Sequence, residues 1–208
     1  MTYLKFKKHT WIIAEIGVNH NGNEKIARKL IDAAKQSGAD AVKFQLFSAE
    51  NIILENGKKP NYIRNNSKLN KKSQFQILKD LELSFESMKR LQNYSKKKKI
   101  EFLISPFDNI SIDRVIELNL KKIKIPSGEI NNFPYLEKIS KFKKKIILST
   151  GMATMNEVEN ALKILTKYRV KKNDITVLHC TTDYPTKPKD VNLRAMTTIK
   201  EKLNVKVG

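Results

Sequence analysis

Ala41-Val42-Lys43-Phe44-Gln45 is a short apolar run that ends in a polar residue and has a lysine within it. Such runs recur along the chain, and a further one begins at Asn204. The other five are Trp11–Glu15, Phe102–Ser105, Ile123–Ser127, Ile146–Ser149 and Val177–Cys180. Strands that repeatedly place polar groups at the same end build one shared site at one face of a sheet or barrel.

Amphipathic helical patterns separate these runs. Asn23 is expected to cap one helix and Gly38 to end it, Pro134 to begin another, and residues 154–157 form a capping box. Strands that alternate with helices predict a parallel α/β sheet. A doubly wound sheet usually has a G-x-G-x-x-G turn after its first strand, and residues 17–22 lack that pattern.

We therefore predict an α/β fold of the (β/α)8 TIM-barrel type, truncated in the seventh unit. The chain has 208 residues, whereas a complete barrel typically takes about 250. Residues 1–208 would form one partial barrel domain. Residues 48–70 lack a regular pattern, and we expect them to form a loop near the barrel mouth.

The formal net charge of +20 is typical of proteins that bind nucleic acid or a membrane surface. Here, however, the lysines cluster at expected helix ends and connections, for example at 96–99 and 143–145. Aromatic and basic residues do not interleave as they do in single-strand binders. No stretch approaches the roughly 18 apolar residues of a membrane span. We therefore expect no nucleic-acid or membrane partner.

A single cysteine, Cys180, excludes an internal disulfide and fits a reducing compartment, so we expect a cytoplasmic protein. No signal-like apolar segment follows the basic residues 1–10. Cys180 itself is interpreted as a small buried residue, because nothing marks it as an activated nucleophile. His179, on the same run, is interpreted as a satisfied core histidine.

Alternation along a strand separates the residues that face the barrel interior from those that face the helices. Val42 and Phe44 share one face of the second run, which leaves Lys43 and Gln45 pointing inward. Lys124 repeats this arrangement in the fourth run. A buried lysine is costly unless it is paired with an anion. One interpretation is that a lysine reaches a structural carboxylate, for which Glu15 is available.

The alternative is that both lysines bind the phosphate or carboxylate of a ligand, with Ser127 and Ser149 supplying hydroxyl groups. Two inward lysines on different strands favour this second interpretation. Glu15 and Glu129 also stand at strand ends. Each could be a general base, could orient water, or could pair with a lysine, and spacing alone does not choose among these roles.

Read together, these segments resemble the N-acetylneuraminate (sialic acid) synthase family, and legionaminic acid synthase-like members are also close. The resemblance runs in order over essentially the whole chain, and as a set its motifs are highly specific. The stretches that carry it are Ile13–Gly22, Val42–Gln45, Ser105–Asp108, Lys124–Glu129, Leu148–Met152 and His179–Pro185.

The resemblance implies a barrel that condenses phosphoenolpyruvate with an N-acetylated hexose, such as N-acetylmannosamine, to a nonulosonic acid and phosphate. Glu15 would contact the sugar, and Glu129 would orient or deprotonate a metal-bound water. Four residues would hold phosphoenolpyruvate: Lys43, Lys124, Ser127 and Ser149. Tyr184 would shape the sugar pocket. Gln45 and Thr182 complete the set of implied substrate-binding residues.

The resemblance also implies a divalent metal ion, Mn or Mg, and a homodimer in the full-length protein. The metal histidines, the eighth strand and a C-terminal antifreeze-like (SAF) domain would lie beyond Gly208, so we expect residues 1–208 alone to be inactive. One motif departs from the family. Thr182 stands where Asn is common, so a hydroxyl replaces an amide near the phosphate.

Two other functions remain open on the sequence alone. One is a barrel aldolase that forms a Schiff base through Lys43 or Lys124. The other, from a different class, is a basic nucleic-acid-binding module, although the strand-end pattern gives it no support.

Overall fold

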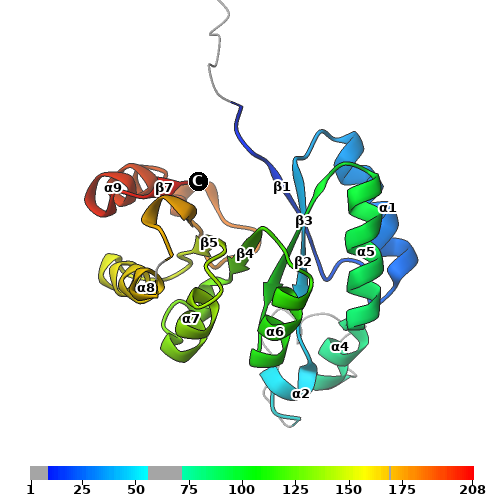
Figure 1. Ribbon diagram of the computed structural model, residues 1–208. Helices are drawn as coiled ribbons and strands as arrows, with labels where there is room; N and C mark the ends of the chain where they lie inside the picture. Colours follow the sequence, from blue (N-terminus) through cyan, green and yellow to red (C-terminus); the bar gives the residue numbers. More distant parts are fainter. Residues whose placement is uncertain (1–8, 56–71, 169) are drawn as a thin grey trace, which may run out of the picture.

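The computed structural model describes residues 9–55, 72–168 and 170–208. Strands alternate with helices along the chain, and the helices lie on the outer side of the strands (Figure 1). The strands are β1 (Ile13–Gly17), β2 (Ala41–Leu46), β3 (Glu101–Pro106), β4 (Lys122–Ile125), β5 (Lys145–Ser149), β6 (Ile175–Leu178) and β7 (Lys206–Val207). The α-helices are α1 (Glu24–Gln36), α2 (Ala49–Ile52), α4 (Gln74–Leu81), α5 (Phe85–Lys97), α6 (Asn109–Glu117), α7 (Phe133–Ser140), α8 (Met155–Lys167) and α9 (Arg194–Leu203).

All strand pairs are parallel, and the strands follow one another in chain order. One sheet has the order β1-β2-β3 and the other β4-β5-β6-β7, with β3 and β4 lying next to each other. A doubly wound sheet would reverse its strand order at a switch point, and no reversal occurs among the described strands. The prediction of a parallel α/β fold is therefore confirmed, and each of the six apolar runs overlaps a strand.

Local capping explains where the helices begin. The Asn23 side chain accepts hydrogen bonds from two backbone N–H groups in the first turn of α1, and Thr154 and Glu157 form the capping box of α8. Pro134 lies in the first turn of α7 as expected. α6 begins at Asn109, and the Asp108 side chain caps it by accepting a hydrogen bond from the Ser111 backbone N–H.

Residues 48–70 are only partly within the described chain. Residues 49–52 of this expected loop form the short helix α2, and residues 56–71 lie outside the described residues. In the part that the structure describes, no helix is long and apolar enough to cross a membrane.

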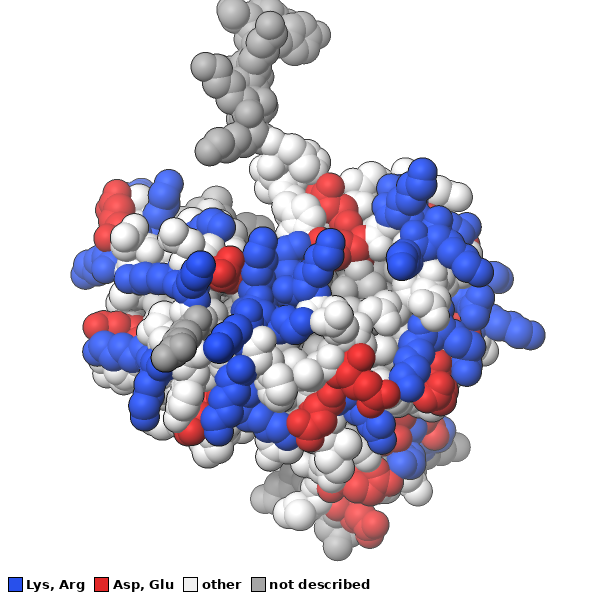
Figure 2. Space-filling model, viewed as in Figure 1, with Lys and Arg blue, Asp and Glu red and all other residues white. Residues whose placement is uncertain are grey.

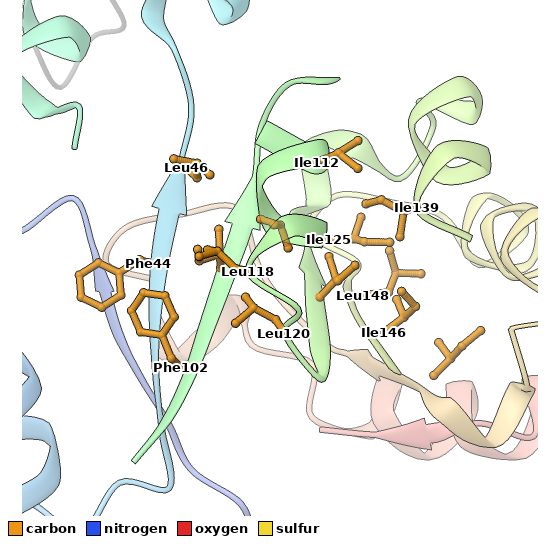
Figure 3. Packing of buried hydrophobic residues seen from close by; sticks show 14 of the residues in the cluster. Phe44, Leu46, Phe102, Ile112, Leu118, Leu120, Ile125, Ile139, Ile146 and Leu148 are labelled. Atoms are coloured by element: carbon orange, nitrogen blue, oxygen red, sulfur yellow. The ribbon is translucent and has the colours of Figure 1, made fainter. Parts of the chain in front are cut away.

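The apolar faces of the strands pack against the helices, as the alternation predicted for β2. Val42, Phe44 and Leu46 are buried, and the Phe44 and Phe102 rings contact each other with centroids 5.1 Å apart. Figure 3 shows this core running from Phe44 through Ile125 to Ile146. Removing apolar surface from water stabilises a fold by about 25 cal/mol per Å². Burial of this layer is therefore the main favourable contribution to the free energy of folding.

The opposite faces of the strands form three successive layers inside the curved sheet. A small apolar cluster, consisting of Ala41, Leu103 and Ile147 with Ile13 and Leu178 against it, fills the middle. Toward the amino ends of the strands, Glu101 pairs with Lys122 at 2.6 Å. Toward the carboxyl ends lies the polar layer described below, so the apolar cluster forms its floor.

Part of the excess of lysine lies at helix ends. Lys35, Lys96, Lys97, Lys167 and Lys202 lie in the last turns of their helices, where a positive charge interacts favourably with the helix dipole. Figure 2 shows lysines and arginines interspersed with acidic side chains over one face of the molecule. This distribution is that of solvated helix surfaces.

Candidate functional site

The centre of the candidate site is an ion pair between Lys43 and Glu15. These residues are register partners on β2 and β1, and the Lys43 ammonium contacts a Glu15 carboxylate oxygen. The ammonium also donates to the Ser105 hydroxyl on β3, at 3.4 Å. The Lys43 side chain is only 11% exposed, whereas that of Glu15 is 49% exposed. For Lys43, a structural carboxylate is thus available, as one interpretation of the sequence anticipated.

Lys124 on β4 is the second inward lysine, and it is more deeply buried at 6% exposure. Its ammonium donates to the carbonyl of Ile125 at 3.1 Å, and within the described residues it has no carboxylate partner. Burial lowers the pKa of Lys124 to about 8, and the nearby charge of Lys43 acts in the same direction. Glu15 and Cys180 oppose this shift only in part. The polar layer therefore contains a buried ammonium group whose charge an anion would stabilise.

Ser149, at the carboxyl end of β5, completes this layer from the next strand. It is buried, and its hydroxyl lies 3.3 Å from the Cys180 sulfur at the end of β6. Cys180 is partly exposed rather than buried, which corrects the sequence prediction, because it faces the open carboxyl end of the sheet.

Gly151 brings two further predicted residues together. It adopts φ +55, and a β-carbon at this position would lie 2.6 Å from the Ser127 hydroxyl and 2.8 Å from that of Thr182. The absence of a side chain thus lets the segments after β4, β5 and β6 converge. Ser127 and Thr182 therefore flank the same backbone segment.

Gln45 and Glu15 meet over a second glycine. Gly17 adopts φ +55 at an irregularity in the β1–β2 register, and its missing β-carbon would lie 3.1 Å from Glu15 Oε1 and 3.7 Å from Gln45 Nε2. The bare backbone of Gly17 leaves room for both side chains above it.

Glu129 lies apart from the lysines, in the loop after β4. Its carboxylate accepts a hydrogen bond from Asn132 Nδ2 at 2.7 Å. It lines a cavity of about 670 Å³ whose walls also include Phe107, Asn132 and Tyr135. Among the described residues, Glu129 forms no hydrogen bond or ion pair with either lysine.

The structure thus gathers most of the residues singled out from the sequence at the carboxyl ends of the strands. Tyr184, by contrast, is 93% exposed and projects from the loop after β6. Its predicted contribution to a pocket wall would need a group that covers it.

Sequence reasoning missed two residues of this region. Ser105 contacts Lys43, and alternation from Leu103 along β3 would have placed it inward. His20 is only 1% exposed and stacks on Phe44, although its position in a loop gave no reason to expect burial.

The interpretation of His179 as a satisfied core histidine was wrong, because its buried Nε2 has no hydrogen-bond partner among the described residues.

The described residues do not fit a metal centre by themselves. Within residues 9–55, 72–168 and 170–208, no three side chains of histidine, cysteine, aspartate or glutamate are grouped so that they could hold a metal ion.

Comparison with known proteins identifies relatives along nearly the whole chain. It is 51% identical over 97% of its length to N,N'-diacetyllegionaminic acid synthase of Campylobacter jejuni, and 43% identical over 95% to the enzyme of that name from Legionella pneumophila. It is 34% identical over 90% to human N-acetylneuraminate-9-phosphate synthase. The chain covers 60%, 56% and 51% of these proteins, respectively.

Solved structures are similar to this chain over nearly its whole length. The N-acetylneuraminic acid synthetase of Leptospira borgpetersenii, crystallised with citrate, matches 97% of this chain and 64% of its own with a TM-score of 0.81 and 31% identity. A phospho-2-dehydro-3-deoxyheptonate aldolase of Thermotoga maritima shares the fold, with a TM-score of 0.64 at 11% identity. The model of the NeuB family matches residues 30–208. The chain therefore belongs to the NeuB family.

Proposed function

We propose that the protein containing this chain condenses phosphoenolpyruvate with an N-acetylated hexose to a nonulosonic acid and phosphate. The observation that carries this proposal is the meeting of Lys43, Lys124 and Ser149 in one layer above an apolar floor. Two ammonium groups held out of water favour a ligand with several negative charges. Phosphoenolpyruvate has a carboxylate and a phosphate that carries about two charges near neutral pH.

Curated relatives suggest which sugar is used. Both legionaminic acid synthases are more than 40% identical to this chain, whereas the sialic acid 9-phosphate synthases are 34% identical. We therefore propose that the product is N,N'-diacetyllegionaminic acid or a close analogue. Thr182, which replaces the amide common in the family, is compatible with a member that acts on a related bacterial sugar.

In the proposed reaction, carbon 3 of phosphoenolpyruvate attacks the aldehyde of the open-chain sugar. Water adds to carbon 2, and the bond between that carbon and the phosphate oxygen breaks. Lys43, Lys124, Ser127 and Ser149 would hold the anionic groups, and Glu15, Gln45 and Tyr184 would bind the sugar. Glu129 would accept a proton from the attacking water. Fixing both substrates above one rigid floor supplies the orientation on which the rate depends.

Further parts of the proposal concern the whole protein. Its catalytic domain would be a (β/α)8 barrel of which this chain forms the first units, followed by an antifreeze-like domain. Mn or Mg would be bound by residues outside those described, and the active form would be a cytoplasmic homodimer. Residues 1–208 alone would be inactive.

Release of inorganic phosphate from phosphoenolpyruvate tests this function. The full-length protein is incubated with Mn or Mg and with either N-acetylmannosamine or a hexose that carries two acetamido groups. We expect phosphate release that depends on the sugar, with the diacetamido sugar preferred. A full-length protein that releases no phosphate with any N-acetylated hexose would contradict the proposal, and turnover by residues 1–208 would contradict only their predicted inactivity.

A further inference from the structure

The two inward lysines differ in what neutralises them. Lys43 contacts the Glu15 carboxylate, whereas Lys124 has only a carbonyl oxygen among its described partners. Lys43, Lys124 and Glu15 together therefore contribute one net positive charge to the polar layer. A ligand that carries two or three negative charges would find one lysine already neutralised.

A bound anion and the Glu15 carboxylate compete for the same ammonium group. If both contacted Lys43, like charges would meet beside a nearly buried side chain, where burial weakens the screening by water. Lys43 cannot escape this competition by moving, because its side chain is almost fully enclosed between β1 and β3. The half-exposed Glu15 is the partner that has room to move.

The backbone near Glu15 is built to allow that movement. The β1–β2 register is irregular between Glu15 and Gly17, and Gly17 presents no β-carbon where the Glu15 carboxylate lies. Gln45, on the other side of this space, supplies an amide that could receive the carboxylate after it leaves Lys43. Rotation of one side chain is therefore sufficient, and no strand has to shift.

We propose that Glu15 is an internal counter-ion of Lys43 that a bound phosphate or carboxylate displaces, so that anion binding releases the Glu15 carboxylate toward the open mouth of the site. Under the proposed function, on which this step rests for the identity of the anion, the released carboxylate would then accept hydrogen bonds from the sugar. Because coupling between two sites is reciprocal, a sugar that holds Glu15 away from Lys43 would tighten the binding of phosphoenolpyruvate equally.

Titration of the full-length protein with inorganic phosphate, followed by calorimetry, tests the displacement. Glu15→Gln keeps the shape of the side chain but removes the competing charge. We expect it to bind phosphate about fivefold more tightly, which corresponds to an ion pair worth about 1 kcal/mol. Glu101→Gln is the matched control, because it removes the same charge from the Glu101–Lys122 pair at the other end of the strands. Its phosphate affinity should equal that of the unmodified protein.

Carbodiimide labelling of carboxylates measures the release directly. In the unmodified protein, phosphate should increase the labelling rate of Glu15 and leave that of Glu101 unchanged. Glu15→Ala provides a second variant with the same expected gain in affinity. Phosphate affinity that is unchanged or weaker in both Glu15 variants, or Glu15 labelling that does not respond to phosphate, would overturn the inference. Neither measurement needs turnover, so a failure of the proposed condensation would be seen separately, in the phosphate-release assay.

Discussion

Gly151 and Ser127 approach each other so closely that a β-carbon on Gly151 would lie 2.5 Å from the β-carbon of Ser127. Real side chains do not tolerate such a contact, and Gly151 also adopts a positive φ that favours glycine. The end of β5 can thus lie against the segment after β4 only because position 151 has no side chain.

The first prediction is that Gly151→Ala weakens phosphoenolpyruvate binding by displacing Ser127 and Thr182. Strain from the positive φ and the overlap should also lower the free energy of unfolding by roughly 1–3 kcal/mol. Gly128→Ala is the control, because a β-carbon there would meet nothing within 4 Å. Calorimetric titration and thermal unfolding of both variants would check this, and equal affinity in the two would contradict the role of Gly151.

Period-two alternation was sufficient to predict much of this fold and part of the site. It placed Lys43 and Gln45 opposite Val42 and Phe44, because strand side chains must alternate wherever one face is covered by helices. It also made Glu15 available to Lys43, since residues at the same end of adjacent parallel strands are neighbours.

The remaining features depend on packing between distant segments, which periodicity does not describe. The cavity beside Glu129 needs α2, α4, the β3–α6 loop and the β4–α7 loop to come together. The contact of Gly151 with Ser127 and Thr182 likewise joins three loops. Exposure of Tyr184 and burial of His20 are set by how their loops fold back, and neither position has a repeating pattern around it.

A second prediction is that Lys124→Met stabilises the fold while it destroys anion binding. The folded-state pKa of about 8 is below the ordinary value of 10.5, so burying this ammonium at neutral pH costs of the order of 3 kcal/mol. Methionine has a similar length and no charge to desolvate. We expect a higher unfolding midpoint in urea at pH 7 and no measurable phosphate binding. A variant that is less stable than the unmodified protein would show that burying the Lys124 ammonium does not destabilise the fold.

A third prediction follows from the titration of Lys124. Above pH 8 the free protein loses this proton, whereas a bound anion favours the charged form. Affinity for phosphoenolpyruvate should therefore fall above pH 8, by up to roughly tenfold per pH unit. The phosphate group of the ligand has its own pKa of about 6, so its charge no longer changes above pH 8. It therefore contributes little to the decline in affinity in that range.

The control for this profile is Lys124→Arg, because arginine stays protonated in this range and should remove the decline above pH 8. Lys122→Arg, at the far end of the strands, should leave the decline in place. A decline of the same steepness in the Lys124→Arg protein would assign the titration to another group.

A fourth prediction concerns acid stability and His20. Burial lowers the pKa of His20 below its ordinary value of 6.5, so the folded protein keeps this ring neutral while the unfolded chain binds a proton. The stability contributed by neutral His20 is present above pH 6.5 and is lost as the pH falls from 6.5 toward the lowered folded-state pKa. The slope of the unfolding free energy against pH should therefore be positive in this window.

His20→Gln should reduce that slope, because glutamine does not titrate and its amide oxygen can still accept the Gly22 N–H that Nδ1 accepts at 3.1 Å. His9→Gln serves as the comparison, since His9 is exposed and paired with Asp40. Urea unfolding at several pH values between 5 and 8 (about the range in which histidines titrate) would measure the slopes. An unchanged slope in His20→Gln would show that another group causes the acid sensitivity.

The last prediction separates the proposed condensation from aldolase chemistry. A Schiff base requires an uncharged amine, and the pKa of Lys124, lowered from 10.5 to about 8, brings this amine closer to that state than an ordinary lysine. The proposed reaction uses both lysines as cations that hold phosphoenolpyruvate, and it forms no covalent bond to the protein. Borohydride added to the active full-length protein with pyruvate or with the sugar should therefore leave the protein mass unchanged. A reduced adduct that appears in the unmodified protein and is absent from Lys124→Met or Lys43→Met would instead establish that lysine as the nucleophile, because only an amine condensed with a carbonyl can be trapped in this way.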